Sequence, residues 1–320
     1  MRVSTGCCRC RHETATGGSE AAQSLWRETE SVTARDLTLM VVFAHPDDEA
    51  FGVGGTLAKY AAEGCQVYLV TATRGEAGQI AEPDLATPAN LPLVREQELR
   101  CACETYGIHP PRFLNYQDGQ LTVVHQGQAV GKLVRIIREL RPDVLLTYDS
   151  HGIYGHYDHI AVHRWTTIAY DLAADPDCFP GQLDGVCQPH QPDKLYYYVL
   201  SEERVADMSQ GGKPAAVMMD GVPFAFTGWR KEEITTVIDV RNYAAVKVRG
   251  IQCHATQVGR HSRFEAALDE MADDPFLTEE SFILARTTAL AGPSAEGSAK
   301  AERPPGVETD LFAGLRESQS

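Results

Sequence analysis

Short apolar runs alternate with helical patterns from about residue 37 onward. The runs predict strands at 37–44, 66–73, 112–116, 141–149, 195–200, 234–240 and 281–286, and the patterns predict helices at 56–64, 95–107, 128–140, 158–173, 243–254 and 264–272. The predicted strands are apolar throughout, which is typical of strands that are buried on both faces of a sheet. We therefore predict an α/β fold, a Rossmann-like and mostly parallel sheet with helices on both faces. In such a sheet the functional site lies at the carboxyl-terminal rim of the strands.

Segments that lack this alternation flank and interrupt it. Residues 1–35 contain Gly, Ser, Thr and charged residues without apolar periodicity, so we expect a disordered leader. Residues 36–290 are predicted to form a single domain. Within that domain, the stretch 174–233 begins with a Pro- and Gly-rich loop, continues as an irregular segment, and is expected to cover the site. Residues 291–320 have the composition of a linker-like tail.

The charge balance excludes some classes of partner. Lys and Arg total 29 against 44 Asp and Glu, which gives a formal net charge of −15. Nucleic acids and anionic membranes are bound through basic surfaces, so we expect neither as a partner. No apolar run approaches the roughly 20 residues that span a bilayer. The N-terminus also lacks the apolar core of a secretory signal.

Cysteine usage indicates a compartment. The chain has nine cysteines, an odd number, and Cys65, Cys101, Cys103 and Cys253 fall in apolar segments that we expect to be buried. Thiols of this kind indicate a reducing cytoplasm. The run C-C-R-C-R-H at 7–12 could suggest a zinc knuckle, but no second ligand pair follows at the usual spacing. We favour a leader whose thiols have no specific role.

The strand at 37–44 ends in A-H-P-D-D-E, which places three acidic residues side by side. Asp47, Asp48 and Glu49 repel one another, and a divalent cation among them would offset that repulsion. His45 and Asp48 are spaced i, i+3 where a helix begins, so their side chains can converge on one point. The segment H-G-I-Y-G-H-Y-D-H at 151–159 follows another strand and offers further ligands on the same rim. Two histidines and one carboxylate form a known catalytic metal set.

Other interpretations of this region remain open at this point. An acidic cluster at a helix start also favours the helix dipole without any metal. The run G-V-G-G-T at 52–56 would support a nucleotide-binding domain, but it lacks the spacing of a dinucleotide fingerprint. Two histidines and a carboxylate also bind Fe²⁺ in non-haem oxygenases, although those enzymes usually form jelly-roll barrels.

The motifs A-H-P-D-D-E and G-H-Y-D-H together resemble the LmbE-like, or PIG-L, family of zinc-dependent N-acetylglucosaminyl deacetylases. Supporting matches are T-R-G-E-A-G (73–78), Y-Q-D-G (116–119), K-V-R-G-I-Q-C-H-A-T-Q (247–257) and the tail sequence E-T-D-L-F-A-G-L (308–315). The resemblance spans about 37–260, and it makes the single domain a catalytic one. The family usually has proline where this chain has Tyr157, a position that is not a ligand.

The resemblance implies a role for each matching residue. It implies His45, Asp48 and His159 as metal ligands, Asp47 as general base, His156 as the residue that stabilises the oxyanion, Arg74 and Asp118 as substrate-binding residues, and Tyr154 as a mobile residue near the oxyanion. A metal ion lowers the pKa of a water ligand toward ~7, so a neighbouring carboxylate can take its proton.

Three further residues have two interpretations each. His163 lies i+4 from His159, so it could be a ligand, but we favour packing or support of a ligand. Glu49 either hydrogen-bonds a ligand histidine or only favours the helix start. His254 either reaches the site from the late helix or is a core histidine.

The resemblance also implies the function. We expect a bacterial, cytoplasmic hydrolase that removes an acyl group, in most cases acetyl, from a small N-acylated amino sugar or its conjugate. Zinc is the expected metal, with Fe²⁺ as the alternative. The competing functions are an amidase that cleaves a thiol-conjugate amide at the same metal, and a nucleotide-binding Rossmann domain without hydrolase activity. A homo-oligomer is left open.

Overall fold

The computed structural model describes residues 37–185, 187–209, 213–219, 221–260, 274–288 and 306–316. The predictions for the leader at 1–35, the cysteine run at 7–12, the helix at 264–272 and most of the tail lie outside the described residues. The proposed division into leader, single domain and tail therefore stays a prediction.

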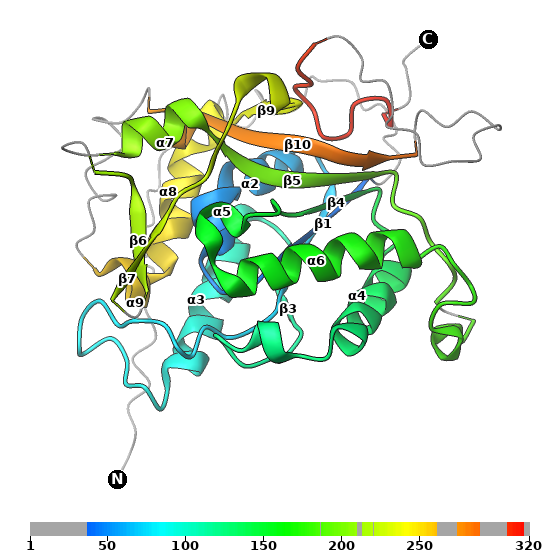
Figure 1. The fold of residues 1–320 in the computed structure, drawn as a ribbon, viewed down its shortest axis with the longest axis horizontal. Coiled ribbons are helices and arrows are strands. Elements are labelled where there is room, and N and C mark those ends of the chain that lie inside the picture. The colour runs from blue at the N-terminus through cyan, green and yellow to red at the C-terminus, as the bar shows by residue number, and fades with distance from the viewer. Residues whose placement is uncertain are drawn as a thin grey trace, which may run out of the picture. The chain divides into compact units, whose positions relative to one another are not determined.

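A mostly parallel sheet forms the centre of the described structure (Figure 1). Its strand order is β3-β2-β1-β4-β5-β10-β9, and β8 pairs with β5 as an eighth strand. The strands are β1 (Thr38–Phe43), β2 (Gln66–Thr71), β3 (Arg112–Phe113), β4 (Val144–Tyr148), β5 (Lys194–Ser201), β8 (Gly228–Trp229), β9 (Thr236–Asp239) and β10 (Glu279–Thr287). Only β10 runs antiparallel to its neighbours. This confirms the predicted Rossmann-like fold class.

Helices cover both faces of the sheet. The described helices are α1 (Asp48–Gly52), α2 (Gly54–Ala62), α3 (Leu91–Tyr106), α4 (Gln126–Leu140), α5 (Gly152–Gly155), α6 (Tyr157–Leu172), α7 (Glu202–Met208), α8 (Ala244–Cys253), α9 (Ala255–Val258) and α11 (Pro275–Thr278). Helices α4 and α6 pack together against β1 and β4, whereas α2, α3 and α8 form a second group of mutually packed helices. None of the helices in these ranges has the length and apolar character that a membrane span requires.

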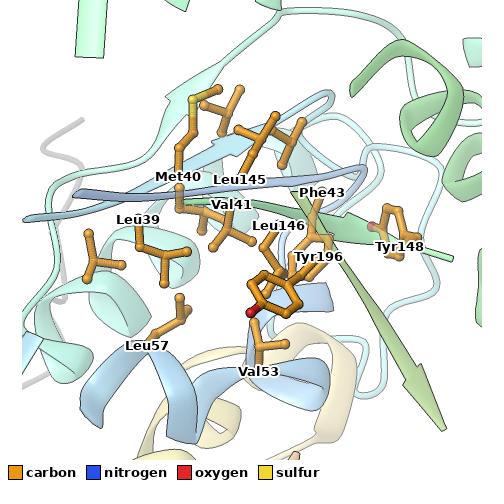
Figure 2. Packing of buried hydrophobic residues seen from close by; sticks show 14 of the residues in the cluster. Leu39, Met40, Val41, Phe43, Val53, Leu57, Leu145, Leu146, Tyr148 and Tyr196 are labelled. Carbon is orange, nitrogen blue, oxygen red and sulfur yellow. The ribbon is translucent and has the colours of Figure 1, made fainter. Parts of the chain in front are cut away.

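The core follows from the apolar strands. Every residue of β1 and β4 is buried, as two-sided burial of a central parallel strand requires. Successive side chains of a strand point to opposite faces. Accordingly, Leu39 and Val41 face Leu57 of α2, while Met40 points to the other side (Figure 2). The strands that carry the candidate motifs are therefore fixed between two apolar layers.

The segment 201–233 corrects one expectation. We expected an irregular stretch, but it contains α7, strand β8 and a hairpin of β6 (Ala216–Met219) and β7 (Val222–Ala225). Its strands A-V-M-M and V-P-F-A are apolar in sequence, but every residue in them is exposed or half-buried. The amide of Thr227 donates to the carbonyl of Ile153 at 2.7 Å, which places Thr227 beside α5, while a cover over the site stays a prediction.

The tail is the second correction. Residues 306–316 are not linker-like, because Leu311 and Phe312 are fully buried in the core. Asp310 accepts a hydrogen bond from the hydroxyl of Tyr60 at 2.9 Å. Glu308 accepts one from the hydroxyl of Tyr196 at 2.6 Å. The polar composition of the tail predicted a linker, although Leu311 and Phe312 within it are part of the core.

The cysteines depart from expectation in part. Cys65 and Cys103 are buried thiols, as predicted. Cys101, on α3, is exposed, and it forms a disulfide with Cys253 at the end of α8. The prediction that all four are buried is wrong for these two, because the apolar neighbours of Cys101 lie on the opposite side of its helix.

Candidate metal centre

The loops after β1 and β4 bring the two motifs together at the rim of the sheet. Strands β1 and β4 are adjacent and parallel, so their carboxyl ends lie side by side. The first loop leads into α1 and carries His45 and Asp48. The second passes through α5 into α6 and carries His159. Two non-glycine residues with positive φ, Asp47 (111°) and Ile153 (68°), flank the site. Backbone strain of this kind is frequent at functional sites.

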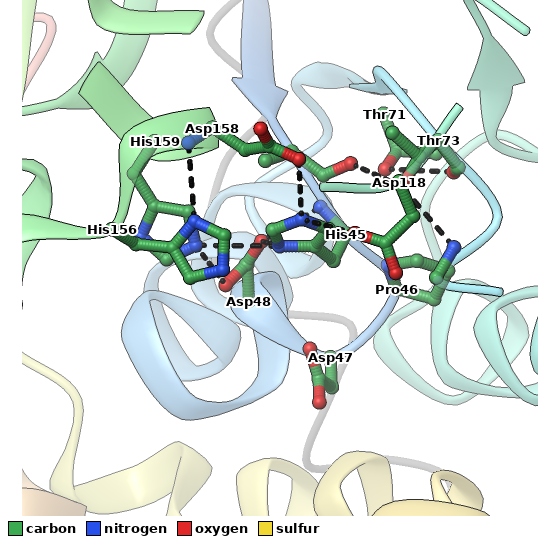
Figure 3. Close-up of polar contacts among 12 residues, drawn as sticks. His45, Pro46, Asp47, Asp48, Thr71, Thr73, Asp118, His156, Asp158 and His159 are labelled. Atoms are coloured by element: carbon green, nitrogen blue, oxygen red, sulfur yellow. Dashed lines mark hydrogen bonds and ion pairs between the residues drawn. The ribbon is translucent and has the colours of Figure 1, made fainter. Parts of the chain in front are cut away.

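His45, Asp48 and His159 form a compact set of potential ligands, here named the triad (Figure 3). His45 Nδ1 lies 3.3 Å from His159 Nε2. Asp48 places one carboxylate oxygen 3.4 Å from His45 Nδ1 and the other 3.3 Å from His159 Nε2. A tetrahedral zinc ion bound at 2.0–2.1 Å separates its ligand atoms by about 3.3–3.4 Å. The facing nitrogens of His45 and His159 therefore have the spacing of two ligands of such an ion, and Asp48 offers one oxygen near each nitrogen.

The outward nitrogens of both imidazoles face hydrogen-bond acceptors. His45 Nε2 lies 2.9 Å from Asp118 Oδ1, and His159 Nδ1 lies 3.2 Å from the carbonyl oxygen of Gly152. If each acceptor takes the ring proton, the lone pairs of His45 Nδ1 and His159 Nε2 point into the triad. Metal-binding histidines are held in this way in most proteins.

Two groups of potential ligands include His45, one with His156 and His159, and the other with Asp118 and Asp158, which approach Nε2. Asp158 lies 3.3 Å from that nitrogen. Its two oxygens already accept the amide protons of Gly119 at 2.7 Å and Leu121 at 3.0 Å. Asp118 likewise accepts the amide proton of Ala77 at 2.9 Å. Asp48 Oδ2 is engaged in the same way by the amide of His45 at 2.8 Å, so we treat the triad side of His45 as a proposed metal site.

Tyr148 supports two members of the triad from the end of β4. Its hydroxyl donates to Asp48 Oδ2 at 2.5 Å and accepts the amide proton of Ala44 at 2.7 Å. Its ring stacks on His159 with centroids 4.2 Å apart and an interplanar angle of 7°. Asp48 and His159 are thus fixed in place by one buried tyrosine.

Asp47 immediately precedes Asp48, and its carboxylate pairs with Arg95. The side chain does not cap α1, and one of its oxygens lies 3.3 Å from Arg95 Nη2. Burial raises the pKa of Asp47 to about 6, although the Arg95 guanidinium opposes that rise. A carboxylate whose pKa lies close to neutrality is suited to accept and return a proton.

His156 is held as a hydrogen-bond donor beside the triad. Its Nδ1 accepts the amide proton of Asp158 at 3.1 Å, so the proton of the neutral ring lies on Nε2. Burial, together with the neighbouring His159 and His45, lowers the pKa of His156 to about 4. The ring of Tyr154 packs edge-on against both His156 and His159. Donation from His156 therefore comes from the neutral imidazole.

Several residues singled out from the sequence have their polar contacts elsewhere. Arg74 donates to Glu96 and Asn115, each at 2.6 Å. His163 places Nδ1 2.9 Å from the carbonyl oxygen of Tyr148 and packs on Tyr197, which is the packing interpretation. Glu49 bonds His254 rather than a ligand histidine.

Sequence reasoning missed three buried residues of the site. Arg95 lies within a helical pattern rich in charge, so it reads as a surface residue. Asp158 lies between His156 and His159, which are the more typical metal ligands. Tyr148 has the pattern of the last residue of a buried strand. A pattern of period 3.6 could have placed Arg95 on the buried face of α3, which it shares with Leu91 and Leu99.

Comparison with known proteins identifies the family. A family model described as PIG-L, GlcNAc-PI de-N-acetylase, matches residues 40–170. A 1D-myo-inositol 2-acetamido-2-deoxy-α-D-glucopyranoside deacetylase from Thermobispora bispora is 36% identical over 88% of this chain and 99% of its own length. The chain belongs to the PIG-L family. A deacetylase of the same name from Thermobifida fusca is 38% identical over 87% of this chain and 99% of its own length.

Membership in the PIG-L family settles the class of chemistry. The chain is a deacetylase-type hydrolase that acts on carbon–nitrogen bonds. Among solved structures, the N,N'-diacetylchitobiose deacetylase from Pyrococcus horikoshii has a TM-score of 0.57 and 19% identity, covering 78% of this chain and 84% of that one. That likeness supports the fold. The nucleotide-binding and oxygenase alternatives lose their basis, because the PIG-L assignment accounts for the same motifs.

Proposed function

We propose that this chain removes the acetyl group from an N-acetylated glucosamine joined to a polyol, with zinc held by His45, Asp48 and His159. The observation that carries the proposal is the position of the two imidazoles, whose facing nitrogens lie 3.3 Å apart and converge with Asp48. The relatives that cover nearly the whole chain are named for the deacetylation of an inositol-linked N-acetylglucosamine. Their names support the substrate class.

The residues around the triad divide the reaction between them. A zinc ion there supplies a Lewis acid that polarises the carbonyl and lowers the pKa of water toward ~7. Asp47 takes a proton from the attacking water as general base and returns it to the departing nitrogen. His156 donates its Nε2 proton in a hydrogen bond to the carbonyl oxygen as negative charge develops there. The products are acetate and the free amine.

The two residues implied as substrate contacts differ in their surroundings. The side chain of Arg74 is 30% exposed, so its remaining donors can meet hydroxyl groups of a sugar or polyol. Asp118 is 8% exposed and faces His45, which favours support of the ligand over contact with substrate. We retain Arg74 as a substrate-binding residue and assign Asp118 to the support of His45.

The test is the release of acetate from a panel of substrates by the zinc-loaded protein. The panel contains 1D-myo-inositol 2-acetamido-2-deoxy-α-D-glucopyranoside, free N-acetylglucosamine and N,N'-diacetylchitobiose. We expect the highest kcat/KM on the inositol conjugate, and we expect Asp47→Ala to keep its zinc while kcat falls about 10²–10⁴-fold. Full activity of Asp47→Ala would refute the mechanism. Preference for another member of the panel would refute the substrate class alone.

The compartment stays a prediction. A cytoplasmic location agrees with the small sugar substrate that we propose. The Cys101–Cys253 bond weighs against it, because disulfides are rare in reducing compartments.

A further inference from the structure

Both polar groups of the peptide unit between Pro46 and Asp47 are hydrogen-bonded to side chains. Its N–H group, on Asp47, donates to Glu49 Oε2 at 3.0 Å. Its carbonyl oxygen, on Pro46, accepts a hydrogen bond from Arg95 Nη2. Asp47 itself has φ 111° and ψ −25°, a strained conformation that non-glycine residues rarely adopt. The surroundings must hold this peptide in place, or the backbone would relax.

Glu49 connects this peptide to a distant helix. Its second oxygen lies 2.7 Å from Nε2 of His254. His254 directly follows α8 and lies 205 residues after Glu49 in the sequence. Both side chains are completely buried. His254 Nδ1 has no hydrogen-bond partner in the described part of the chain, so the imidazole is best satisfied with its proton on Nε2, donated to Glu49.

Neither residue is placed for contact with substrate. Glu49 has both oxygens engaged, one by His254 and one by the Asp47 amide. With no exposed surface, the pair cannot meet a ligand directly. A buried carboxylate is costly unless its hydrogen bonds are satisfied, and here one of those bonds ends on the backbone of the candidate base.

We propose that Glu49 and His254 are positioning residues, which act on the reaction only through Asp47. Glu49 holds the strained amide of Asp47, and His254 fixes the carboxylate of Glu49. The inference rests on the proposed function, because that function assigns the general base to Asp47. Arg95 is left aside, since it contacts both the peptide and the Asp47 carboxylate and its substitution would have two effects.

The proposal predicts a specific pattern in single variants. Glu49→Ala should lower kcat about 10²-fold, the size of effect that follows a displacement of about 1 Å, while KM and zinc content remain as in the wild type. Glu49→Gln keeps an oxygen that accepts the Asp47 amide, so it should recover most of the lost rate. His254→Ala should resemble Glu49→Ala, and it serves in its place if that variant does not fold.

The decisive experiment is a double-mutant cycle with Asp47→Ala, followed by single-turnover release of acetate. If Glu49 acts only through Asp47, adding Glu49→Ala to Asp47→Ala should leave the residual rate unchanged. Glu98→Ala is the matched control, because Glu98 is another buried carboxylate, whose oxygens accept from the amide and hydroxyl of Thr256. This control should keep the wild-type kcat.

Three results would overturn the inference, and they differ in what else they remove. If Glu49→Ala lowers the rate by the same factor with and without Asp47, the positioning role is wrong and the proposed function stands. If Asp47→Ala alone keeps the wild-type rate, the general base is wrong and the positioning role falls with it. Equal loss of kcat in Glu98→Ala and Glu49→Ala would also reduce the effect to general destabilisation.

Discussion

Asp118 Oδ1 lies 2.9 Å from Nε2 of His45, on the side of the ring that faces away from Asp48 and His159. Removal of such a partner typically weakens metal binding about 10–100-fold. We therefore expect Asp118→Ala to lower zinc affinity by that factor, measured by competition with a chromogenic chelator. Asp84→Ala, at an exposed site, is the control. An unchanged zinc affinity with a raised KM would return Asp118 to the role of a substrate contact.

His156 should contribute to the rate rather than to metal binding. We expect His156→Ala to lower kcat about 10²–10³-fold, as expected for the loss of one donor to the developing oxyanion. Zinc content should not change, because the ring Nδ1 already accepts the Asp158 amide. His163→Gln, a change one turn after His159 at a residue whose ring contacts the carbonyl oxygen of Tyr148, should have little effect on kcat. A wild-type kcat in His156→Ala would exclude the oxyanion role.

Metal removal should abolish activity reversibly. Dialysis against a chelator should bring acetate release to background, and stoichiometric zinc should restore it. Asp48→Ala removes one of the three proposed protein ligands, so this variant should not regain activity at the same zinc concentration. Since Tyr148 donates to Asp48 at 2.5 Å, Tyr148→Phe should bind zinc more weakly while keeping all three ligands. Activity that survives complete removal of metal would contradict the whole scheme.

The stabilisation that Asp310 in the tail contributes to the folded state should depend on pH. Burial disfavours ionisation of Asp310, but the hydrogen bonds from Arg316 and the Phe312 amide outweigh it and lower the pKa of that carboxyl. A lowered pKa in the folded state means that the stabilisation is present above the unfolded pKa of about 4 and is lost as pH falls through the folded value. The difference in Tm between the wild type and Asp310→Asn should therefore be largest at neutral pH. It should shrink toward pH ~3, and a difference independent of pH would refute the linkage.

The buried end of the tail should stabilise the domain. Phe312 is fully buried and contacts Tyr60 edge-on, with ring centroids 5.1 Å apart. We expect Phe312→Ala to lower the free energy of unfolding by about 3–5 kcal/mol in urea denaturation. Val307→Ala, at a residue that is 51% exposed, should change it by less than about 0.5 kcal/mol. Equal effects of the two substitutions would mean that the tail does not dock in solution.

Strands in which every residue is buried could be predicted from the sequence. The run V-L-L-T-Y is buried throughout in β4, and it was recognisable because four of its five residues are apolar or aromatic. The β6–β7 hairpin was missed although the pair Asp220-Gly221 between A-V-M-M and V-P-F-A is typical of a hairpin turn. Phe312 was missed because only tertiary contacts show that two apolar residues in a polar tail enter the core.

Some residues of the site could also be predicted from the sequence, and others could not. His45 and Asp48 could be paired from their spacing alone, because three residues at a helix start bring side chains together. His159 required the resemblance, since its approach to His45 depends on the register of β1 and β4. Arg95 and His254 reach Asp47 and Glu49 from α3 and from the end of α8, and no local pattern encodes a contact between helices.

The disulfide between Cys101 and Cys253 has a practical consequence. It joins α3, which carries Arg95, to the end of α8, immediately before His254. Both residues contact the turn that presents Asp47, directly or through Glu49. Reductant in a purification buffer would therefore break the covalent link between α3 and the end of α8, the two segments that contact the turn of Asp47 directly or through Glu49. Rates of different variants are comparable only when every preparation has been brought to one thiol oxidation state.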